Sequence, residues 1–556
     1  MKNYSYTIIL LFVFLGSIGL PSLSAQQIVI NEFAASNASV IEDEEDEADD
    51  WIELYNASET TVGLSGMFLS DNANNLVKWQ IPEGISIPPH GFLLFWCDDQ
   101  EDQGSMHTSF KLSSGGEDLL LIHSDGTTVI DSYSFGPQTT DTSTGRESDG
   151  SGEWMVFAAP SPNESNGSLG NALAKQPVAS QIPGHYNNAF TLTLSTDLQD
   201  AIIRYTTDGS VPNEDDEIYN TSLTIDSTTV LRSRTFHADF IPSRTTTNTY
   251  LFGVEHDFAI FCISSDTANI FGLENGIYPN WSDDIEHEVH VEFFEPDGTF
   301  GFGQNLGIQV FGGYSQTYDH KSLSLTARSE YGANKINYPL FPDQEYSEYG
   351  ALVLRNSGSD WKKTMFRDAV ASGLLRDIDD VDAMIKDPDM EFQAFRPAIV
   401  YMNGQYFGIH NMREKMDWRY LETHYGIDKD EVDVVQRKDK LDQGNLDAWD
   451  DYSDFIEDAD FNNAEDMETL KTWIDPDHFA DYFLAEIYLD NTDWPGNNNR
   501  RWRERKPGKQ WRYFLYDLDR VMGLIPLVDD YNSGNWSSPS LEYVTQDSST
   551  YSWNQE

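Results

Sequence analysis

Apolar and polar residues alternate in short runs over the first part of the chain. Residues 27–33, 51–55 and 91–96 follow this pattern and are separated by turns rich in Asn, Asp, Gly and Pro. A period of two places every second side chain on the same face of a strand. We therefore predict an all-β module over residues 26–165, with the two packed sheets of an immunoglobulin-like sandwich.

A stretch rich in Pro, Ser, Asn and Gly leads into residues 166–180, which we predict to be a linker. Residues 202–206 then resume the strand pattern and end at a turn that contains Asp208 and Gly209. Residues 181–252 are therefore predicted to form a second, smaller immunoglobulin-like β-sandwich.

From residue 254 onward the pattern becomes mixed. Strand-like runs at 320–328 and 351–355 come first, and helix-like runs dominate after Met365. This order predicts a small β-rich lobe followed by a helical lobe, which together form an α+β domain over residues 254–556. The sequence has no repeat of fixed period such as marks solenoids or propellers.

The clearest helix of this domain begins after residue 475. Asp475 can cap it, and Pro476 suits its first position. A loop at 491–499 contains Pro and Gly and must end the helix. Residues 511–515 read as the next strand. The buried face of the helix is marked by apolar side chains at spacings of three and four, namely Phe479, Phe483, Leu484, Ile487 and Tyr488.

The first 25 residues carry an export pattern. Lys2 precedes an apolar run at 8–20, and small residues lead up to Ala25, which is the layout of a signal peptide over residues 1–25. The run is shorter than the roughly 20 residues needed to cross a bilayer. We therefore expect a secreted protein, extracellular or at the cell surface, without a membrane span.

The composition indicates an acidic surface over packed cores. The formal charge is −58, from 93 acidic and 35 basic residues, while 39% of residues are hydrophobic and 13% aromatic. A surface this acidic repels nucleic acid and anionic lipid, so we expect no nucleic-acid partner. Cys97 and Cys262 fall in different predicted modules, which favours two buried free thiols over a disulfide.

An acidic run at 42–50 is the first candidate for metal binding. Clustered carboxylates in such a loop could hold Ca²⁺. Runs of this kind are more often solvated loops, and we favour that interpretation.

Two pairs of residues match the needs of phosphoryl transfer. The reaction needs a carboxylate that orients the attacking hydroxyl, oxygen ligands for a divalent metal, and a cation on the phosphates. Asp493 and Asn498 are five residues apart, as are the catalytic Asp and the metal-binding Asn of a protein-kinase loop. Asp517 and Asp519 end the next strand, where residues two apart can face one cation.

The sequence around these residues resembles that of the spore-coat protein H (CotH) family of atypical kinases. Two motifs carry the resemblance, Asp493-Trp494-Pro495-Gly496-Asn497-Asn498 and Tyr516-Asp517-Leu518-Asp519. Upstream landmarks occur in the expected order, namely His320-Lys321-Ser322, 354–358, Arg367-Asp368, 401–408 and Arg413-Glu414. The resemblance covers about residues 254–530 and implies a two-lobed atypical protein-kinase-like domain.

Both β modules resemble domains found in exported proteins. The segments 30–33 and 50–56 are similar to the signature of the lamin-tail domain. The segment 205–212 resembles the β-sandwich appended to chitobiases and β-hexosaminidases. Carbohydrate or cell-surface contact through these modules stays open, and a spacer role is favoured for the second.

The resemblance to CotH kinases implies a role for each matching residue. Lys321 would contact the nucleotide phosphates, and Asp493 would be the catalytic carboxylate. Arg367 and Glu414 would help to bind the nucleotide, with structural ion pairs as the alternative for both. The implied metal ligands are Asp517 first, then Asn498, Asp519 and Asn497.

Two features depart from the ordinary kinase pattern. The sequence has no G-x-G-x-x-G loop, but several glycines precede Lys321 and could form a looser cover over the phosphates, namely Gly301, Gly303, Gly307, Gly312 and Gly313. The chain also ends at Glu556, soon after the Asp517 motif. Further helices would be expected there, which leaves open whether the sequence is a fragment.

We therefore expect a secreted kinase that uses ATP with Mg²⁺ or Mn²⁺ to phosphorylate a basic or Ser-rich protein. Transfer of another part of the nucleotide stays open. The alternative is a non-catalytic surface or adhesion scaffold with a kinase-like fold. A glycoside hydrolase is the least favoured hypothesis, since it rests on the chitobiase-like module and on Trp494, Trp502 and Trp511, which more simply pack a core.

Overall fold

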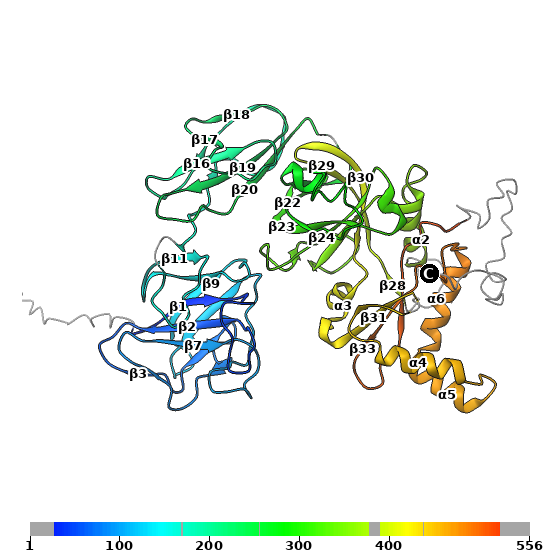
Figure 1. Ribbon diagram of the computed structural model, residues 1–556, viewed down its shortest axis with the longest axis horizontal. Helices are drawn as coiled ribbons and strands as arrows, with labels where there is room; N and C mark the ends of the chain where they lie inside the picture. The colour runs from blue at the N-terminus through cyan, green and yellow to red at the C-terminus, as the bar shows by residue number, and fades with distance from the viewer. Residues whose placement is uncertain (1–26, 168–170, 255, 377–389, 438, 523–556) are drawn as a thin grey trace, which may run out of the picture.

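The computed structural model describes residues 27–167, 171–254, 256–376, 390–437 and 439–522. The predicted signal peptide lies outside these residues. Three successive parts, all rich in β-strands, follow one another along the described chain (Figure 1). None of the helices in these ranges is both long enough and apolar enough to span a membrane.

The first part packs two larger antiparallel sheets around one core. Its strands are β1 (Ile28–Ala34), β2 (Trp51–Asn56), β3 (Val62–Gly63), β4 (Phe68–Ser70), β5 (Trp79–Gln80), β6 (Ser86–Ile87), β7 (Phe92–Trp96), β8 (Glu117–Ile122), β9 (Val129–Phe135), β10 (Ser143–Ser148) and β11 (Ser151–Phe157). The sheet orders are β11-β10-β1-β2-β7 and β5-β4-β8-β9, with a small β3-β6 pair. Phe33, Leu54, Leu69 and Leu121 bring both sheets into the shared core. This part is the predicted β-rich module.

The second part is a smaller β module. Its strands are β12 (Val178–Ala179), β13 (Gly184–Tyr186), β14 (Phe190–Leu192), β15 (Leu194–Ser195), β16 (Ile202–Thr206), β17 (Glu217–Ile218), β18 (Leu223–Ile225), β19 (Thr229–Phe236) and β20 (Thr246–Phe252). The main sheet has the order β13-β20-β19-β16-β17. The predicted linker is partly structured, because Ala172 and Ala174 are buried and the Ala174 amide donates to the Ile241 carbonyl at 2.8 Å.

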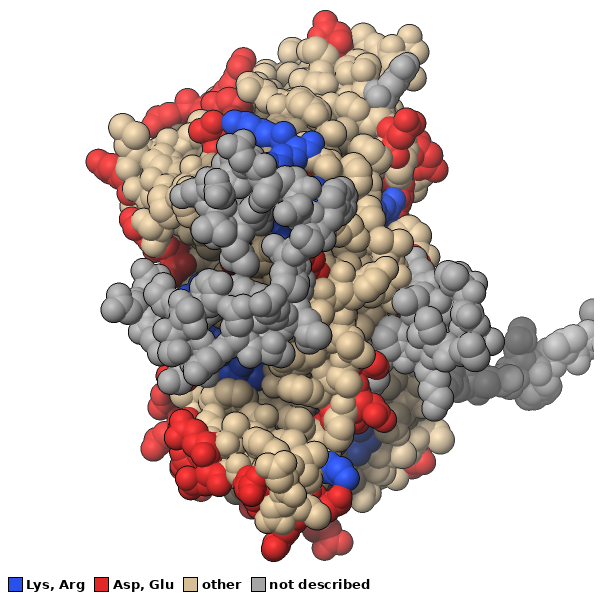
Figure 2. All heavy atoms as spheres, turned by 90° about the vertical axis from the view of Figure 1, so that its right-hand side faces the viewer, with Lys and Arg blue, Asp and Glu red and all other residues tan. Residues whose placement is uncertain are grey.

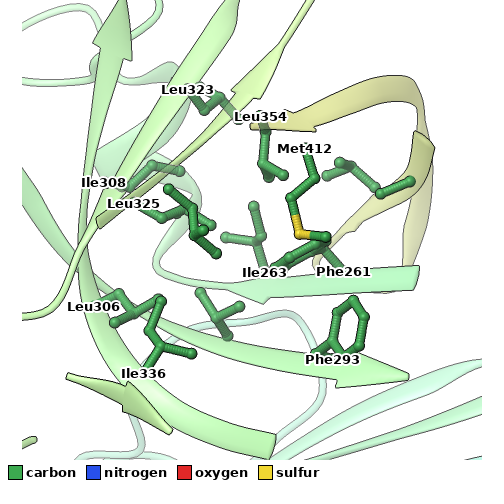
Figure 3. Close-up of a cluster of buried hydrophobic side chains, with 14 of the residues drawn as sticks. Phe261, Ile263, Phe293, Leu306, Ile308, Leu323, Leu325, Ile336, Leu354 and Met412 are labelled. Atoms are coloured by element: carbon green, nitrogen blue, oxygen red, sulfur yellow. The ribbon is translucent and has the colours of Figure 1, made fainter. Parts of the chain in front are cut away.

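A closed barrel forms the first half of the third part. Its strands are β21 (Ala259–Ser264), β22 (His287–Phe294), β23 (Phe300–Phe311), β24 (Ser322–Thr326), β27 (Ala351–Arg355), β30 (Gln405–Glu414) and β29 (Phe395–Met402). The parallel pairing of β29 with β21 closes it. Figure 3 shows the apolar side chains that fill its interior, among them Phe261, Leu325 and Met412.

Two local features of the fold follow from the types of residue present. Asn403 and Gly404 have φ angles of 47° and 75°, the conformation of a tight hairpin turn between β29 and β30. Cys262 on β21 and Cys97 in the first part are both buried and free, as predicted.

The second half of the third part is a sheet with helices packed on it. The sheet order is β28 (Glu391–Phe392), β34 (Arg512–Leu515), β33 (Arg500–Glu504), β31 (Val432–Gln436) and β32 (Lys440–Gln443). The helices are α2 (Arg367–Arg376), α3 (Trp418–Tyr425), α4 (Asp447–Asp458), α5 (Ala464–Trp473) and α6 (Pro476–Tyr488). Asp475 caps α6 and accepts a hydrogen bond from the Asp477 amide at 2.9 Å, as predicted. Ala371, Tyr482 and Leu515 pack α2 and α6 against β34.

This arrangement is richer in strands than the expected pair of lobes. β29 and β30 follow Met365 in sequence but complete the barrel, and four strands of the second sheet follow them. The helix-like pattern after Met365 did not predict these strands, because they form by pairing with segments that are distant in the sequence.

A buried carboxyl group joins the second β module to the barrel. Glu292 on β22 is 1% exposed, and its Oε1 accepts a hydrogen bond from the Thr249 amide of β20 at 3.1 Å. Burial raises the pKa of Glu292 to about 7, because the charged form loses its hydration. Its second oxygen makes no hydrogen bond.

We expect Glu292→Gln to stabilise the protein more at pH 8 than at pH 5. Between its usual pKa and about 7 the folded state holds a proton that the unfolded state has lost, so Glu292 makes stability fall as pH rises through this window. The amide cannot ionise, and the gain should be about 1–3 kcal/mol at pH 8. Melting curves at both pH values test this, with Glu288→Gln, exposed on the same strand, as the control. An equal effect at both pH values would contradict it.

Candidate functional site

A cavity of about 380 Å³ lies where the barrel meets the C-terminal sheet. One wall comes from the end of β23, the turn at 312–316 and β27. The other comes from the loop after α6 and the segment after β34. The structure places five of the predicted site residues in its lining, namely Asp493, Asn497, Asn498, Asp517 and Asp519.

The loop after α6 holds its polar side chains together. Asp493 Oδ2 accepts hydrogen bonds from Asn497 Nδ2 at 3.2 Å and Asn498 Nδ2 at 3.3 Å. Asn498 Nδ2 also lies 3.4 Å from the Asp517 carbonyl oxygen, which links the two motifs. Burial raises the pKa of Asp493, although Arg520 Nη1, 3.2 Å from its Oδ1, opposes this shift. The carboxylate is therefore a stronger base than an exposed aspartate.

The segment after β34 turns instead of staying extended. Asp517 has a φ of 59°, in the left-handed region, which corrects the expectation that Asp517 and Asp519 point the same way because they lie on a strand. Their carboxylates nevertheless converge, because both contact Arg355. Arg355 Nη2 donates to Asp519 Oδ2 at 3.1 Å and also contacts Asp517 Oδ1.

Close approach of the backbone completes this corner of the cavity. The amide of Ser359 donates to Asp519 Oδ2 at 2.7 Å. A Cβ atom at Gly358 would lie 1.8 Å from the same oxygen, so no other residue fits there without displacing Asp519. The conformation of this corner thus depends on a glycine within the 354–358 landmark.

A buried ion network anchors the Asp517 turn to the barrel. Asp368 Oδ2 lies 2.8 Å from Arg413 Nη1 and 3.3 Å from Arg355 Nη1, and Asp368 Oδ1 accepts from the Leu518 amide at 3.1 Å. Burial alone would raise the pKa of Asp368, but the two guanidinium groups outweigh it and lower the pKa. Burial, followed by repulsion from Asp517, raises the pKa of Asp519 to about 8. The carboxyl groups of Asp368, Asp517 and Asp519 thus share two guanidinium groups, and a metal cation beside Asp517 and Asp519 would relieve the repulsion that raises the pKa of Asp519.

Three known families match successive parts of the chain. Residues 308–543 match the CotH kinase protein family. Residues 21–137 match the lamin tail domain, and residues 182–247 match the chitobiase/β-hexosaminidase C-terminal domain. All three resemblances predicted from sequence motifs are thereby confirmed, in the predicted order. No curated protein matches the chain.

Lys321 of the CotH domain does not line the cavity. Its Nζ donates to the carbonyl oxygens of Gln316 and Tyr318, the latter at 2.9 Å, and lies 5.6 Å from the centre of the Tyr278 ring. The neighbouring Ser322 faces the cavity instead, because successive side chains of a strand point to opposite faces. In this conformation Lys321 holds the turn at 312–316 through the Gln316 carbonyl group.

We expect Lys321→Met to lower the free energy of unfolding by about 1–3 kcal/mol, because two carbonyl groups lose their donor. Nucleotide affinity should fall only a fewfold, since the turn is loosened but no phosphate contact is removed. Urea unfolding and nucleotide titration measure the two effects, with the exposed Lys363→Met as the control. Unchanged stability combined with complete loss of nucleotide binding would show that Lys321 reaches the phosphates directly.

Arg367 and Glu414 also lie outside the lining of the cavity. Arg367 Nη1 donates to the Val521 carbonyl at 3.0 Å, and its Nε lies 3.5 Å from Asp360 Oδ1. Glu414 Oε2 accepts from the Ala394 amide at 2.9 Å, and its Oε1 lies 2.6 Å from His424 Nε2. These contacts agree with the structural alternative, in which both residues fix the chain around the site.

The cations of the cavity were not assigned a role from the sequence. Those that line it are Arg355, Arg437, Lys440 and Arg500. Four of the 35 basic residues of a strongly acidic chain therefore gather in one cavity. Figure 2 shows how acidic side chains lie around the edges of one face of the molecule. Arg500 follows Asn498 by two residues in the sequence. This position next to a predicted metal ligand was the sequence feature that could have identified Arg500 as part of the site.

The glycines predicted to cover the phosphates divide into two groups. Gly301, Gly303 and Gly307 lie within β23, in the wall of the barrel. Gly312 and Gly313 form the turn that lines the cavity, and Gly312 has a φ of 118°. Trp494, Trp502 and Trp511 are buried, as expected for core residues, and offer no exposed sugar-binding platform.

Proposed function

We propose that the CotH domain is a phosphotransferase that moves the γ-phosphoryl group of ATP to a hydroxyl group of a protein, with a divalent metal. The observation that supports this most strongly is the convergence of Asp493, Asn498, Asp517 and Asp519 in one cavity that also contains four basic side chains. These are the groups that phosphoryl transfer requires.

Asp493 is suited to orient and deprotonate the attacking hydroxyl. Its carboxylate is held by two carboxamide groups and by Arg520, so its direction is fixed before a substrate arrives. Its raised pKa brings it closer to the range in which a carboxylate accepts a proton effectively.

The donor set beside Asp493 fits Mg²⁺ or Mn²⁺. Asp517 and Asp519 offer carboxylate oxygens and Asn498 a carboxamide oxygen, which are the ligand types that these cations prefer. A bound metal would neutralise charge on the transferred phosphoryl group. Arg355, which now contacts both carboxylates, would then be available to the phosphates.

The remaining cations and the glycine turn are suited to bind the nucleotide phosphates. Arg437 and Lys440 are exposed at the cavity, and the Arg500 guanidinium group lies 5.3 Å from the centre of the Tyr516 ring. Gly312 and Gly313 allow backbone amides to approach a phosphate closely. Together they supply a cover of the kind that the missing G-x-G-x-x-G loop provides in ordinary kinases.

We further propose that the chain is secreted and acts on basic or Ser-rich proteins. The export pattern of residues 1–25 supports secretion, and the formal charge of −58 favours a basic partner by electrostatic attraction.

Label transfer from ATP tests the proposal. The full chain is incubated with Mn²⁺, a basic Ser-rich protein and ATP labelled at either the γ- or the α-phosphorus. Incorporation of the γ label that is lost in the Asp493→Asn/Asp517→Asn double variant is the expected result. Incorporation of the α label would replace the kinase with a nucleotidyl transferase. No incorporation of either, with no nucleotide binding, would favour the scaffold alternative.

A further inference from the structure

A second cluster of ionisable side chains lies in the lamin-tail module, far in sequence from the CotH cavity. Ligand atoms of Asp43, Asp98 and His107 lie within 4.8 Å of one another, and so do those of Asp43, Glu47 and Asp49. Asp43 belongs to both triads. The acidic run at 42–50 is therefore folded onto the segment that carries His107, and it is not merely a solvated loop.

Backbone hydrogen bonds bring three segments together at this point. The Trp96 amide donates to the Met106 carbonyl at 2.8 Å, and the Thr108 amide donates back to the Trp96 carbonyl at 2.9 Å. Asp98 and His107 are thereby placed side by side just beyond β7. The Cys97 amide donates to the Asp50 carbonyl at 2.7 Å, which ties the acidic run to the same place.

Four buried side-chain atoms in this cluster have no hydrogen-bond partner. They are Asp43 Oδ2, Asp49 Oδ2, Gln103 Oε1 and His107 Nε2. His107 and Asp98 are both 0% exposed. No Lys or Arg of the described residues forms an ion pair with Asp43, Glu47, Asp49 or Asp98. Glu44 Oε1 lies 3.4 Å from His107 Nε2. Unsatisfied buried acceptors are costly, and a cation would satisfy several at once.

The histidine decides which cation fits. His107 Nδ1 contacts the Asp98 carboxylate, which orients the ring and leaves Nε2 as an electron-pair donor. A carboxylate that holds one ring nitrogen while the other faces carboxylates is the usual surrounding of a transition metal. Calcium prefers oxygen ligands alone. The sequence analysis favoured a solvated loop and left Ca²⁺ as the alternative, whereas the histidine favours a different metal.

We propose that the lamin-tail module binds one Zn²⁺ ion between the acidic run and the His107 segment, with Asp43 and His107 as ligands. Glu47 and Asp49 complete the oxygen donors, and Asp98 positions His107. The ion would fasten the loop at 42–50 to the end of β7, so the site is structural and independent of the kinase chemistry.

Metal titration of the full chain tests this proposal. The Asp517→Asn background removes a principal metal ligand of the CotH cavity. After treatment with a chelator, the protein is titrated with Zn²⁺, Ca²⁺ and Mn²⁺ by calorimetry, and with Co²⁺ by visible absorption. We expect one Zn²⁺ per chain, a higher melting temperature, and a Co²⁺ spectrum that indicates nitrogen and oxygen ligands.

Matched variants locate the ion. Asp43→Asn and His107→Gln should each weaken Zn²⁺ binding at least about 100-fold, and Asp98→Asn about 10–100-fold. Asp46→Asn is the control, because Asp46 lies exposed on the same loop in a left-handed conformation that Asn also adopts. Absence of Zn²⁺ binding, equal affinity of Asp43→Asn and Asp46→Asn, or a preference for Ca²⁺ would each overturn the proposal. Asp43→Asn keeps the test valid if His107→Gln fails to fold.

Discussion

Asp517→Asn should abolish the thermal stabilisation of the CotH domain by ATP with Mn²⁺. A ligand at a hundredfold excess over its Kd stabilises the folded state by about 2.7 kcal/mol. For a domain of this size that is a rise of about 5–10 °C in the melting temperature. The substitution removes a charged metal ligand, so the stabilisation by nucleotide should be lost. The rate of the transfer reaction should fall by about 1000-fold or more.

The Asp517→Asn substitution should leave the backbone conformation unchanged. Asp517 has a φ of 59°, and Asn tolerates that conformation as well as Asp does, so the backbone should keep its shape. Asp454→Asn, on the exposed face of α4, is the control and should behave as the wild type. A normal nucleotide-dependent shift in Asp517→Asn would remove this residue from the metal site.

Asp493→Asn should separate binding from chemistry. The amide can still accept hydrogen bonds from Asn497 and Asn498, so the loop should persist and the Kd for ATP should change less than about threefold. The transfer rate should fall by about 100- to 10,000-fold, because the amide cannot take a proton from the attacking hydroxyl.

Single-turnover kinetics with saturating ATP measure this effect. A loss of affinity equal to the loss of rate would mean that Asp493 acts through nucleotide or metal binding and not on the hydroxyl. A rate close to that of the wild type would assign the catalytic carboxylate to another residue.

Local elements of the fold were readable from the sequence. β16 and β27 have the predicted bounds, and Asp475 caps the predicted helix. Each depends on neighbours within a few residues. Closure of the barrel depends on the pairing of β21 with β29, more than 130 residues apart in the sequence, and no local pattern encodes it.

The site was predicted by its motifs but not in its geometry. The structure brings Asp493, Asn498, Asp517 and Asp519 together, whereas the extended conformation invoked for Asp517 is not present. The direction of Lys321 depends on which face of β24 turns into the barrel, and this is set by the distant strands. Arg355 contacts Asp517 and Asp519 because the turn that carries these two residues packs against β27. Contacts between distant segments therefore account for what sequence analysis missed.

The location of the metal and nucleotide tests the central claim most directly. Crystals of the full chain grown with Mn²⁺ and a non-hydrolysable ATP analogue would locate the metal by its anomalous scattering. We predict a peak within bonding distance of the Asp517 and Asp519 carboxylates, with the nucleotide phosphates between it and Arg500. A nucleotide bound elsewhere, or an ordered nucleotide in this cavity with no metal beside Asp517, would contradict the account.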